Sequence, residues 1–188
     1  FETAHVARDG ERIPVEISAH LFVADGERWI LSIARDITER KRAQESMETR
    51  LGYERGLARC AHELMYSGNG ARTRALSHLR EASGICRAYV FENFVDDDDG
   101  LCMRQVHEDC AEAIEPQIDN PVLRHVPYSD GFERWRRELE EGRPVCGPID
   151  AFPESEQEIL RSQDILSLLV LPIEVKDRFW GFVGFDHT

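Results

Sequence analysis

The stretch SLLVLPIEVKDRFWGFVGF, residues 167–185, decides how the second half of this chain folds. It reads as two strands, 167–175 and 178–185, joined across Lys176-Asp177. The run from Leu168 to Leu171 is continuously apolar, which is typical of a strand buried on both faces of a sheet. The two strands are therefore predicted to lie at the centre of a sheet.

The residues before this hairpin alternate between helix and strand signals. A helix from about Arg72 to Ala82 is stopped by Ser83-Gly84, and Ser155-x-x-Glu158 predicts a capped helix that runs to Gln163. The other predicted elements are a strand over 87–94, an acidic tip at 96–100, a strand over 101–108, an irregular segment over 110–126 and a helix over 132–141. Together these elements predict an α+β or mixed α/β fold.

The first segment of the chain reads as antiparallel strands. From Ile13 to Leu21 apolar and polar residues alternate, as a half-buried strand requires, because successive side chains face opposite sides. Asp9-Gly10 and Asp25-Gly26 are tight-turn signals on either side, since glycine accepts positive φ, and a further strand is predicted over 28–35. About 35 residues bury too little surface to be stable alone. These strands are therefore expected to need a partner, either further sequence or another chain.

A long charged helix is predicted from Arg40 to about Tyr66. Asp36 stands at an N-cap position with Glu39 three residues later, as in a capping box, and Ser67 to Gly70 supplies turn residues that end the helix. The apolar side chains follow a 4-3 spacing that suits pairing with another helix. They are Met47, Leu51, Ala58, Ala61 and Met65, with Glu54 interrupting the stripe. For the second half, an amphipathic helix packed on its own domain is an equally supported prediction.

Composition and charge argue against several classes of protein. There are 36 Asp and Glu against 23 Lys and Arg, a net charge of -13, so neither nucleic-acid binding nor contact with anionic membranes is expected. No apolar run approaches the ~20 residues of a spanning helix, and Phe1 to Gly10 does not have the pattern of a signal peptide. The five cysteines are odd in number and form no Cys-x-x-Cys pair. Reduced thiols in a cytoplasmic domain are therefore expected.

Three segments near the N-terminus resemble the end of a PAS domain. They are Arg8-Asp9-Gly10-Glu11, Pro14-Val15-Glu16 and Arg35-Asp36-Ile37-Thr38-Glu39-Arg40-Lys41-Arg42. In that family the last three strands close with an Asp-Ile-Thr-Glu-Arg-type tail that enters a signalling helix. The resemblance implies that residues 1–38 are the C-terminal strands of a PAS domain and that residues 39–66 are a signalling or linker helix. It also implies that most of the PAS ligand pocket is absent.

Four separated motifs in the remainder resemble, in their order, a GAF domain. They are RAYVFE at 87–92, PQIDNP at 116–121, FERW at 132–135 and FWGFVGFD at 179–186. The subtype is one found in bacterial multidomain histidine kinases and cyclic-di-GMP signalling proteins. The resemblance implies an antiparallel sheet flanked by helices over residues 67–188, with a first helix that overlaps the linker from about Tyr53. A GAF domain normally continues into a C-terminal helix, so that helix is expected to follow Thr188.

The GAF resemblance places a ligand cavity between the sheet face and the segment 110–150. Such cavities are largely apolar with a few polar groups. The candidate ligand-binding residues are Tyr89, Arg104, Tyr128 and Trp135. By composition, the aromatic residues of this half are mostly expected in the core. They are Tyr89, Phe91, Tyr128, Phe132, Trp135, Phe152 and Trp180.

Two sharper hypotheses concern histidine and nucleotide chemistry. His62-Glu63-Leu64 resembles the phosphoacceptor box of a histidine kinase, but Met65 and Tyr66 follow where that family has Arg and Thr-Pro. An ordinary helix histidine is favoured. The Asn-Lys…Phe…Asp-Glu signature of GAF domains that bind cyclic nucleotides is not visible.

Cysteine and acidic clusters suggest further chemistry. Some GAF domains attach a bilin through a Cys beside a His, but here His107 precedes Cys110 by three residues. A haem or metal site would need a second pair of ligands. Cys102, Cys110 and Cys146 also resemble the thiols of GAF-type methionine sulfoxide reductases, and Asp96 to Asp99 could attract calcium without matching an EF-hand. Incidental thiols and a solvated hairpin tip are favoured.

The predicted function is that of a sensory and signal-relay segment of a bacterial signal-transduction protein. The GAF domain would receive a signal, which would shift the population between two packings of the 40–66 helix in a parallel homodimer. No catalytic residue and no metal site are predicted, a small molecule is the candidate ligand, and the cofactor is unknown. One alternative is a purely structural dimerisation module, and another is the thiol-based reductase. The full-length protein is expected to be a histidine kinase or a diguanylate cyclase.

Overall fold

The computed structural model describes residues 1–66, 68 and 70–188, and it divides the chain after Leu51 into two units. The division lies inside the helix α1 (Thr38–Met65) rather than at either end of it. Of the turn residues predicted to end this helix, Ser67 and Asn69 lie outside the described residues. Among the described residues, no helix combines the length and apolar character that crossing a membrane requires.

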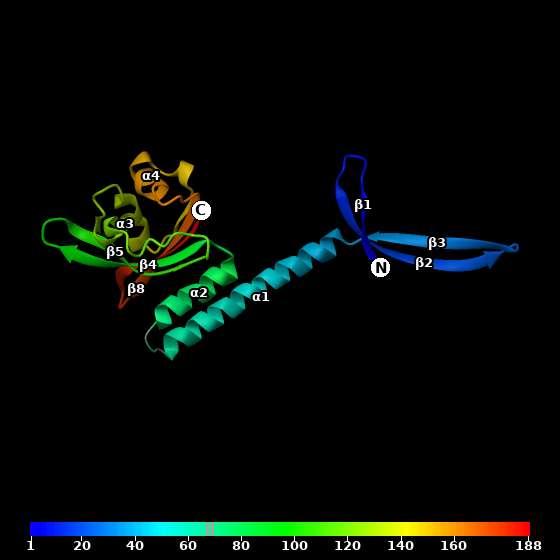
Figure 1. Ribbon diagram of the computed structural model, residues 1–188, viewed down its shortest axis with the longest axis horizontal. Helices are drawn as coiled ribbons and strands as arrows, with labels where there is room; N and C mark the ends of the chain where they lie inside the picture. The colour runs from blue at the N-terminus through cyan, green and yellow to red at the C-terminus, as the bar shows by residue number, and fades with distance from the viewer. Residues whose placement is uncertain (67, 69) are drawn as a thin grey trace. The chain divides into compact units, whose positions relative to one another are not determined.

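The first unit is built on an antiparallel sheet in the order β1-β2-β3. The strands are β1 (Glu2–Val6), β2 (Arg12–Ala24) and β3 (Glu27–Asp36), each pairing with the next along the chain (Figure 1). Among the described residues of this unit, only Val15 and Ile37 are buried. Trp29, Ile30 and Leu31 stay more than half exposed. The predicted strands are confirmed, and so is the expectation that they bury little surface by themselves.

Asp36 caps the entry into α1, which confirms one of the two contacts of the predicted capping box. The carboxylate of Asp36 accepts a hydrogen bond from the backbone N–H of Thr38 at 2.8 Å. Hydrogen bonding from the side chain of Thr38 and then from its backbone lowers the pKa of Asp36. Arg40 and Lys41 in the first turns form ion pairs with Glu2 at 2.6 and 3.1 Å. These contacts join the beginning of the helix to the sheet of the first unit.

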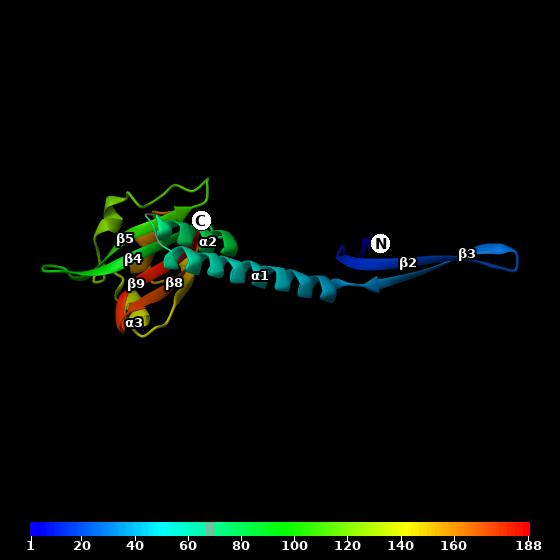
Figure 2. The same ribbon diagram turned by 90° about the horizontal axis from the view of Figure 1, so that it is seen from below.

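The second unit contains an antiparallel sheet in the order β6-β5-β4-β9-β8-β7 (Figures 1 and 2). Its strands are β4 (Arg87–Asp96), β5 (Gly100–Cys110), β6 (Val126–Pro127), β7 (Val145–Pro148), β8 (Ser167–Val175) and β9 (Arg178–His187). The predicted hairpin of β8 and β9 is confirmed and lies inside the sheet. The short edge strands β6 and β7 were not predicted, because two to four residues show no periodicity.

Helices cover the two faces of this sheet. Helix α2 (Ala71–Ser83) packs on β4 and β5, while α3 (Glu133–Glu140) packs on β7, β8 and β9, with α4 (Glu154–Arg161) nearby. Two short 3₁₀ helices, η1 (Pro121–Arg124) and η2 (Ile149–Ala151), lie in the connections. The unit is thus an α+β fold with an antiparallel sheet between helices, as predicted.

The capping box predicted at Ser155 is wrong. Helix α4 begins at Glu154 after Pro153, and no side chain caps it. Proline has a φ angle suited to the start of a helix, so the helix begins earlier than a serine cap would place it. Helix α3 agrees with its prediction to within one residue at each end.

Strand β8 is buried on one face rather than on both. Leu168 and Val170 are buried, but Leu169 and Leu171 on the other face are each 37% exposed. These exposed leucines correct the prediction of a fully buried strand. Leu169 lines a groove of about 400 Å³ together with Tyr53, Leu57 and other apolar side chains of α1, α2 and β9.

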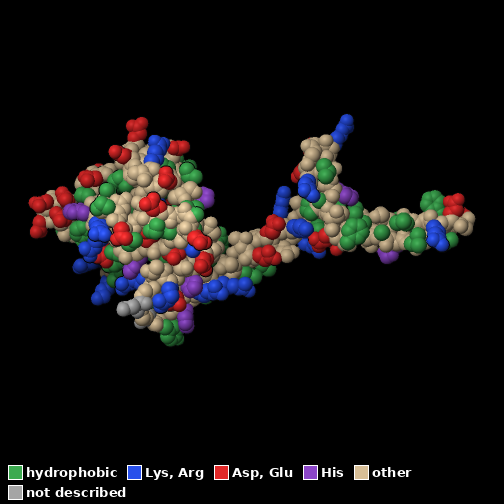
Figure 3. Space-filling view, viewed as in Figure 1, with side chains coloured by type: hydrophobic (Ala, Val, Ile, Leu, Met, Phe, Trp, Pro, Cys, Tyr) green, Lys and Arg blue, Asp and Glu red, His purple; other side chains and the backbone are tan. Residues whose placement is uncertain are grey.

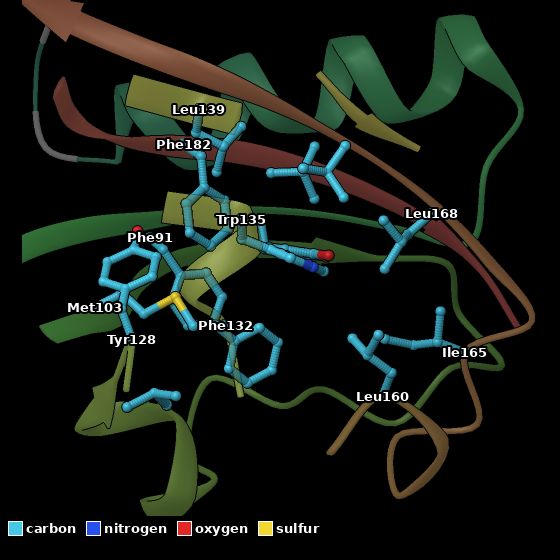
Figure 4. Close-up of a cluster of buried hydrophobic side chains, with 14 of the residues drawn as sticks. Phe91, Met103, Tyr128, Phe132, Trp135, Leu139, Leu160, Ile165, Leu168 and Phe182 are labelled. Carbon is cyan, nitrogen blue, oxygen red and sulfur yellow. The ribbon is translucent and has the colours of Figure 1, made fainter. Parts of the chain in front are cut away.

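The core lies between the sheet and helices α3 and α4. Figure 4 shows Phe91 and Phe182 with Trp135 beside them, and the two phenyl rings stack at 5.0 Å between centroids. Of the seven aromatic residues expected in the core, all are buried except Trp180, which is partly exposed. The buried cluster comprises Tyr89, Phe91, Met103, Leu123, Val126, Tyr128, Phe132, Trp135, Leu139, Val145, Ile149, Phe152, Leu160, Ile165, Leu168, Val170 and Phe182.

Helix α1 meets α2 through small residues. Gly56 is buried, and a Cβ placed on it would lie 2.3 Å from the Cβ of Ala82. Glu63 accepts a hydrogen bond from the guanidinium of Arg74 at 2.8 Å. The 4-3 stripe does not make this contact, since its members from Met47 to Met65 are exposed. The second half of α1 therefore packs on its own unit, as the alternative prediction had it, but through Gly56 rather than through the stripe.

Candidate functional site

A small cavity of about 30 Å³ lies within the core of the second unit. It has room for about two water molecules. Strand β4 contributes alternate side chains, Arg87, Tyr89 and Phe91, because successive residues of a strand face opposite sides. The remaining lining residues are Met103, Gln105, Glu108, Leu123, Val126, Phe132, Trp135, Ile159, Leu160, Gln163, Ile165 and Phe182.

A break in strand pairing brings two polar residues of β5 to this cavity. Val90 pairs with His107 and Phe91 pairs with Gln105, so the register shifts between them. An extra residue in one strand changes which side chains share a face. As a result both Gln105 and Glu108 line the cavity, although strict alternation would place them on opposite faces.

The polar end of the cavity is an ion pair removed from solvent. Arg87 and Asp186 are each 1% exposed, and the guanidinium donates to the carboxylate at 3.1 and 3.0 Å. The carboxylate of Glu108 lies 3.9 Å from Arg87 and accepts the backbone N–H groups of Gln117 and Ile118. Burial raises the pKa of Asp186, while Arg87 opposes this shift. One cation thus serves two buried carboxylates.

Gln105 supplies a buried polar atom without a partner. Gln105 is 8% exposed, and its Oε1 accepts no hydrogen bond from the residues that the structure describes. A buried acceptor left unsatisfied costs about 1–3 kcal/mol. A donor group placed in the cavity would remove this cost.

Two aromatic walls of the cavity are held by different means. The indole N–H of Trp135 donates to Glu156 at 2.8 Å, and Arg134 donates to the same buried carboxylate at 2.8 and 2.6 Å. The ring of Tyr89 lies over Gly184, where an added Cβ would be 2.2 Å from it. Burial raises the pKa of Tyr89, so its phenol stays protonated and can donate.

The structure brings together two of the four predicted ligand-binding residues. Tyr89 and Trp135 line the cavity. Arg104 is exposed on the other face of β5, where its guanidinium donates to Glu92 at 3.0 Å. Tyr128 is buried in the core and donates to Asn93 at 2.9 Å, but it does not line the cavity. Neither Arg104 nor Tyr128 lines this cavity, since alternation turns Arg104 to the other face and the Tyr128 hydroxyl donates to Asn93. Ligand binding by the four residues stays a prediction.

Several residues that line the cavity were missed by sequence reasoning. Arg87, Gln105, Glu108 and Gln163 are the polar ones. The first motif of the GAF resemblance begins at Arg87 and the last ends at Asp186, which was a usable signal for that pair. The position of Gln105 depends on the register shift and had no such signal.

The residues of the competing hypotheses lie elsewhere. His62 is exposed near the end of α1 with its ring 4.6 Å from that of Tyr66. Cys110 is partly buried, and burial together with Glu108 raises its pKa to about 12. A thiol with this pKa is protonated at neutral pH and is a poor nucleophile. All five cysteines are unpaired.

No protein-family model matches this chain. In sequence, 159 residues, or 84% of the chain, are 39% identical to the methanogenesis regulatory histidine kinase FilI of Methanothrix harundinacea. A further 84 residues, 45% of the chain, are 46% identical to the methyl sulfide methyltransferase-associated sensor of Methanosarcina acetivorans. The chain spans only 18% and 6% of the lengths of these curated relatives.

Solved structures with a similar fold include photosensory proteins. The chromophore-binding domain of the Stigmatella aurantiaca bacteriophytochrome matches 99% of this chain and 64% of its own, with a TM-score of 0.59 at 16% identity. The phycocyanobilin-bound GAF domain of a cyanobacterial phytochrome matches 72% of this chain and 79% of its own, with a TM-score of 0.58 at 17% identity. With the antiparallel sheet between helices described above, these likenesses show that the second unit has the GAF fold.

Proposed function

We propose that this chain is a sensory and signal-relay segment of a signal-transduction protein, in which the GAF unit binds a small polar ligand. The observation that carries this proposal is the buried cavity with an unsatisfied acceptor, Gln105 Oε1, at its wall. The similarity to a regulatory histidine kinase and to a sensor supports the sensory role. Most other cavity walls, Tyr89 and Trp135 among them, are apolar or aromatic, and Arg87, Glu108 and Gln163 supply the few further polar groups, as in ordinary ligand pockets.

The size of the cavity limits the ligand. About 30 Å³ holds water-sized groups, so a larger ligand must displace an aromatic side chain. Tyr89 is the movable wall in this proposal, because Trp135 is hydrogen-bonded to Glu156. Ligand binding would thus favour a second packing of the core, and its differential affinity for the two packings is what drives a population shift. Covalent bilin attachment is not part of the proposal, because the described residues that line the cavity include no cysteine.

Native mass spectrometry of the purified chain, compared with its denatured mass, tests for a ligand. We expect a small molecule that is lost on denaturation, and we expect Gln105→Met to reduce its occupancy by about tenfold or more, since one buried hydrogen bond is lost. Arg104→Met, on the adjacent residue of the same strand, is the matched control and should keep the ligand. Equal occupancy in both variants would refute the assignment to this cavity.

A structural dimerisation module is the second candidate, and the small volume of the cavity favours it. In that case the aromatic side chains simply fill the GAF pocket. Gln105→Met would then raise the free energy of unfolding by about 1 kcal/mol or more, because it removes a buried unsatisfied group. The chain would also carry no ligand under any purification conditions.

We also propose that α1 relays the signal as part of a parallel homodimer. Met47, Leu51 and Met65 of the predicted stripe are exposed on α1, and Leu169 and Leu171 expose a further apolar surface on β8. A second copy of the chain would cover the exposed stripe of α1. Sedimentation equilibrium of the chain and of Leu51→Glu should show a dimer that becomes a monomer, whereas a wild-type monomer at high concentration would exclude this relay.

The first unit is proposed to be the C-terminal part of a PAS domain. The three antiparallel strands lead directly into a helix whose first turn is capped by Asp36, and this arrangement supports the assignment. The exposed apolar side chains of β3, Trp29 and Leu31 among them, would be covered by the rest of that domain. Solving the structure of a longer chain, with residues preceding Phe1, tests whether those strands complete one sheet.

A further inference from the structure

The buried charges at the polar end of the cavity do not balance. The Arg87 guanidinium donates to the Asp186 carboxylate at 3.1 and 3.0 Å. The carboxylate of Glu108, on a side chain that is 3% exposed, lies 3.9 Å from the same guanidinium, which is too far for a hydrogen bond. The backbone N–H groups of Gln117 and Ile118 donate to Glu108 but carry no net charge. Among the described residues at this end of the cavity, one cation therefore faces two carboxylates.

Gln105 adds an unsatisfied acceptor on the same strand as Glu108. Both residues belong to β5, and both line the cavity because the strand pairing shifts register before them. The Oε1 of Gln105 is buried and accepts no hydrogen bond from the described residues. A ligand that satisfies this end of the cavity must therefore donate a hydrogen bond and also bring a positive charge. A neutral donor would do only the first, and an anion would increase the charge imbalance.

The aromatic walls of the cavity also suit a cation. They are Tyr89, Phe91, Phe132, Trp135 and Phe182. Figure 4 shows the last four together in the core, where the ring of Trp135 lies 5.2 Å from that of Phe132 and 6.0 Å from that of Phe182. Aromatic rings attract an ammonium group placed over their faces, and the attraction is strongest where water is excluded. The cavity thus combines a negative polar end with walls that favour a cation.

A second pocket outside the core adjoins this cavity. It has a volume of about 240 Å³ and shares Arg87 and Gln163 with the cavity lining. Its other lining residues include Glu115 and Asp164, both exposed, and Arg87 is the one basic side chain among the described residues that line either space. Acidic side chains cover much of the second unit in Figure 3. A field of this sign concentrates cations near the pocket.

We propose that the ligand of the cavity is a small protonated amine of the size of methylammonium. Its ammonium group would donate to Gln105 Oε1 and balance the charge of Glu108, while its methyl group lies against the aromatic walls. About 30 Å³ has room for about two water-sized groups, and methylammonium has one carbon and one nitrogen. A longer or more substituted amine would require Tyr89 to move. This inference rests on the proposed function, because it names the chemical class of ligand for the same cavity.

Calorimetric titration and thermal melting of the chain with four probes at matched ionic strength test the proposal. The probes are methylammonium, methanol, formate and tetramethylammonium. Methanol has the same size without the charge, formate has the opposite charge, and tetramethylammonium keeps the charge but is larger and has no N–H. We expect methylammonium to bind once per chain and to raise the melting temperature in a saturable way. The other three should bind at least about tenfold more weakly.

Variants of the cavity assign the binding to this site. Gln105→Met and Glu108→Gln should each weaken methylammonium binding by about tenfold or more, since each removes a buried partner of the ammonium group. Asp97→Asn removes a carboxylate from the exposed tip of the β4–β5 hairpin and should keep the affinity. Gln105→Met leaves every buried charge in place, so it remains informative if Glu108→Gln does not fold.

The possible outcomes separate this inference from the proposed function. Tetramethylammonium binding as tight as methylammonium binding, or equal weakening by Asp97→Asn and Glu108→Gln, would overturn the inference in favour of diffuse attraction to an acidic surface. Saturable binding of methanol or formate that Gln105→Met abolishes would overturn the amine but keep a small polar ligand in the cavity. If none of the four probes binds, the amine is excluded, and the native mass spectrum still decides whether the cavity holds another ligand.

Discussion

Substituting Gly56 by alanine tests the packing of α1 on α2. The new Cβ would lie 2.3 Å from the Cβ of Ala82 and 3.0 Å from the carbonyl oxygen of His78. Carbon atoms in contact stand about 3.5–4.0 Å apart. The two helices would therefore have to separate by more than about 1 Å at this point.

The magnitude follows from two opposing effects. Alanine is about 1 kcal/mol more favourable than glycine inside a helix, while forcing a methyl group into a packed contact costs about 1–3 kcal/mol. Gly56→Ala should therefore lower the free energy of unfolding by about 0–2 kcal/mol. Gly52→Ala, one turn earlier, places its Cβ with nothing within 4 Å. This control should raise the free energy of unfolding by up to about 1 kcal/mol.

Urea unfolding followed by circular dichroism measures the difference between the two variants. We expect it to be about 1–3 kcal/mol, with unchanged dependence on urea concentration. A double-mutant cycle with Ala82→Gly should show favourable coupling, because removing the opposing methyl makes room for the new one. Equal stabilisation by Gly52→Ala and Gly56→Ala would refute a close contact between α1 and α2 at Gly56.

Three further predictions concern the buried network and the thiols. Glu156→Gln weakens the acceptor of the Trp135 indole N–H and should cost about 2–3 kcal/mol in urea unfolding. Asp186→Leu leaves the Arg87 guanidinium buried without its main partner and should cost about 3–5 kcal/mol, whereas Arg87→Met combined with Asp186→Leu should cost much less, as thermal melts would show. Burial raises the pKa of Cys110 to about 12, so at pH 8 its alkylation, followed by mass spectrometry, should be about 10–100-fold slower than that of an ordinary thiol, because its greater nucleophilicity only partly offsets the small thiolate fraction. The alkylation should accelerate as pH rises towards 12.

Each of these predictions has a defined contradiction. Arg136→Met removes an exposed ion pair on the same helix as Trp135 and should change stability little. If Arg136→Met and Glu156→Gln lose equal stability, the hydrogen bonds of Glu156 do not stabilise the fold as predicted. Equal loss of stability in Asp186→Leu and in the double variant Arg87→Met with Asp186→Leu would contradict the second prediction. It would mean that Glu108 compensates the charge of Arg87 when Asp186 is absent. Alkylation of Cys110 as fast as that of exposed Cys146 would contradict the raised pKa.

Much of the fold could be predicted because its signals are local. The alternation of Ile13 to Leu21 and the apolar strands from Ser167 to Phe185 each identified an element that the structure contains. Turn residues such as Asp9-Gly10 and Lys176-Asp177 also fall in turns. The edge strand Val145–Pro148 was missed because it is held by pairing with β8, a partner distant in the chain.

The candidate sites could be predicted only in part. Tyr89 and Trp135 were identified as aromatic residues of recognisable motifs, and both line the cavity. Arg104 was predicted as a ligand-binding residue, yet its neighbours Met103 and Gln105 are the ones that line the cavity. One residue of register decides between these faces, since a shift of one reverses every side chain of a strand.

The sequence by itself determined where the longer helices and strands form, the acidic balance and the order of the recognisable motifs, because periodicity, turn chemistry and composition act over a few neighbouring residues. Only the tertiary structure decided which distant side chains meet. The Arg87–Asp186 pair, the Gly56–Ala82 contact and the Cys102–His125 pair each join separate segments. Their proximity depends on sheet order, on the register shift in β5 and on how closely helices approach, all of which are set by packing between segments rather than within them.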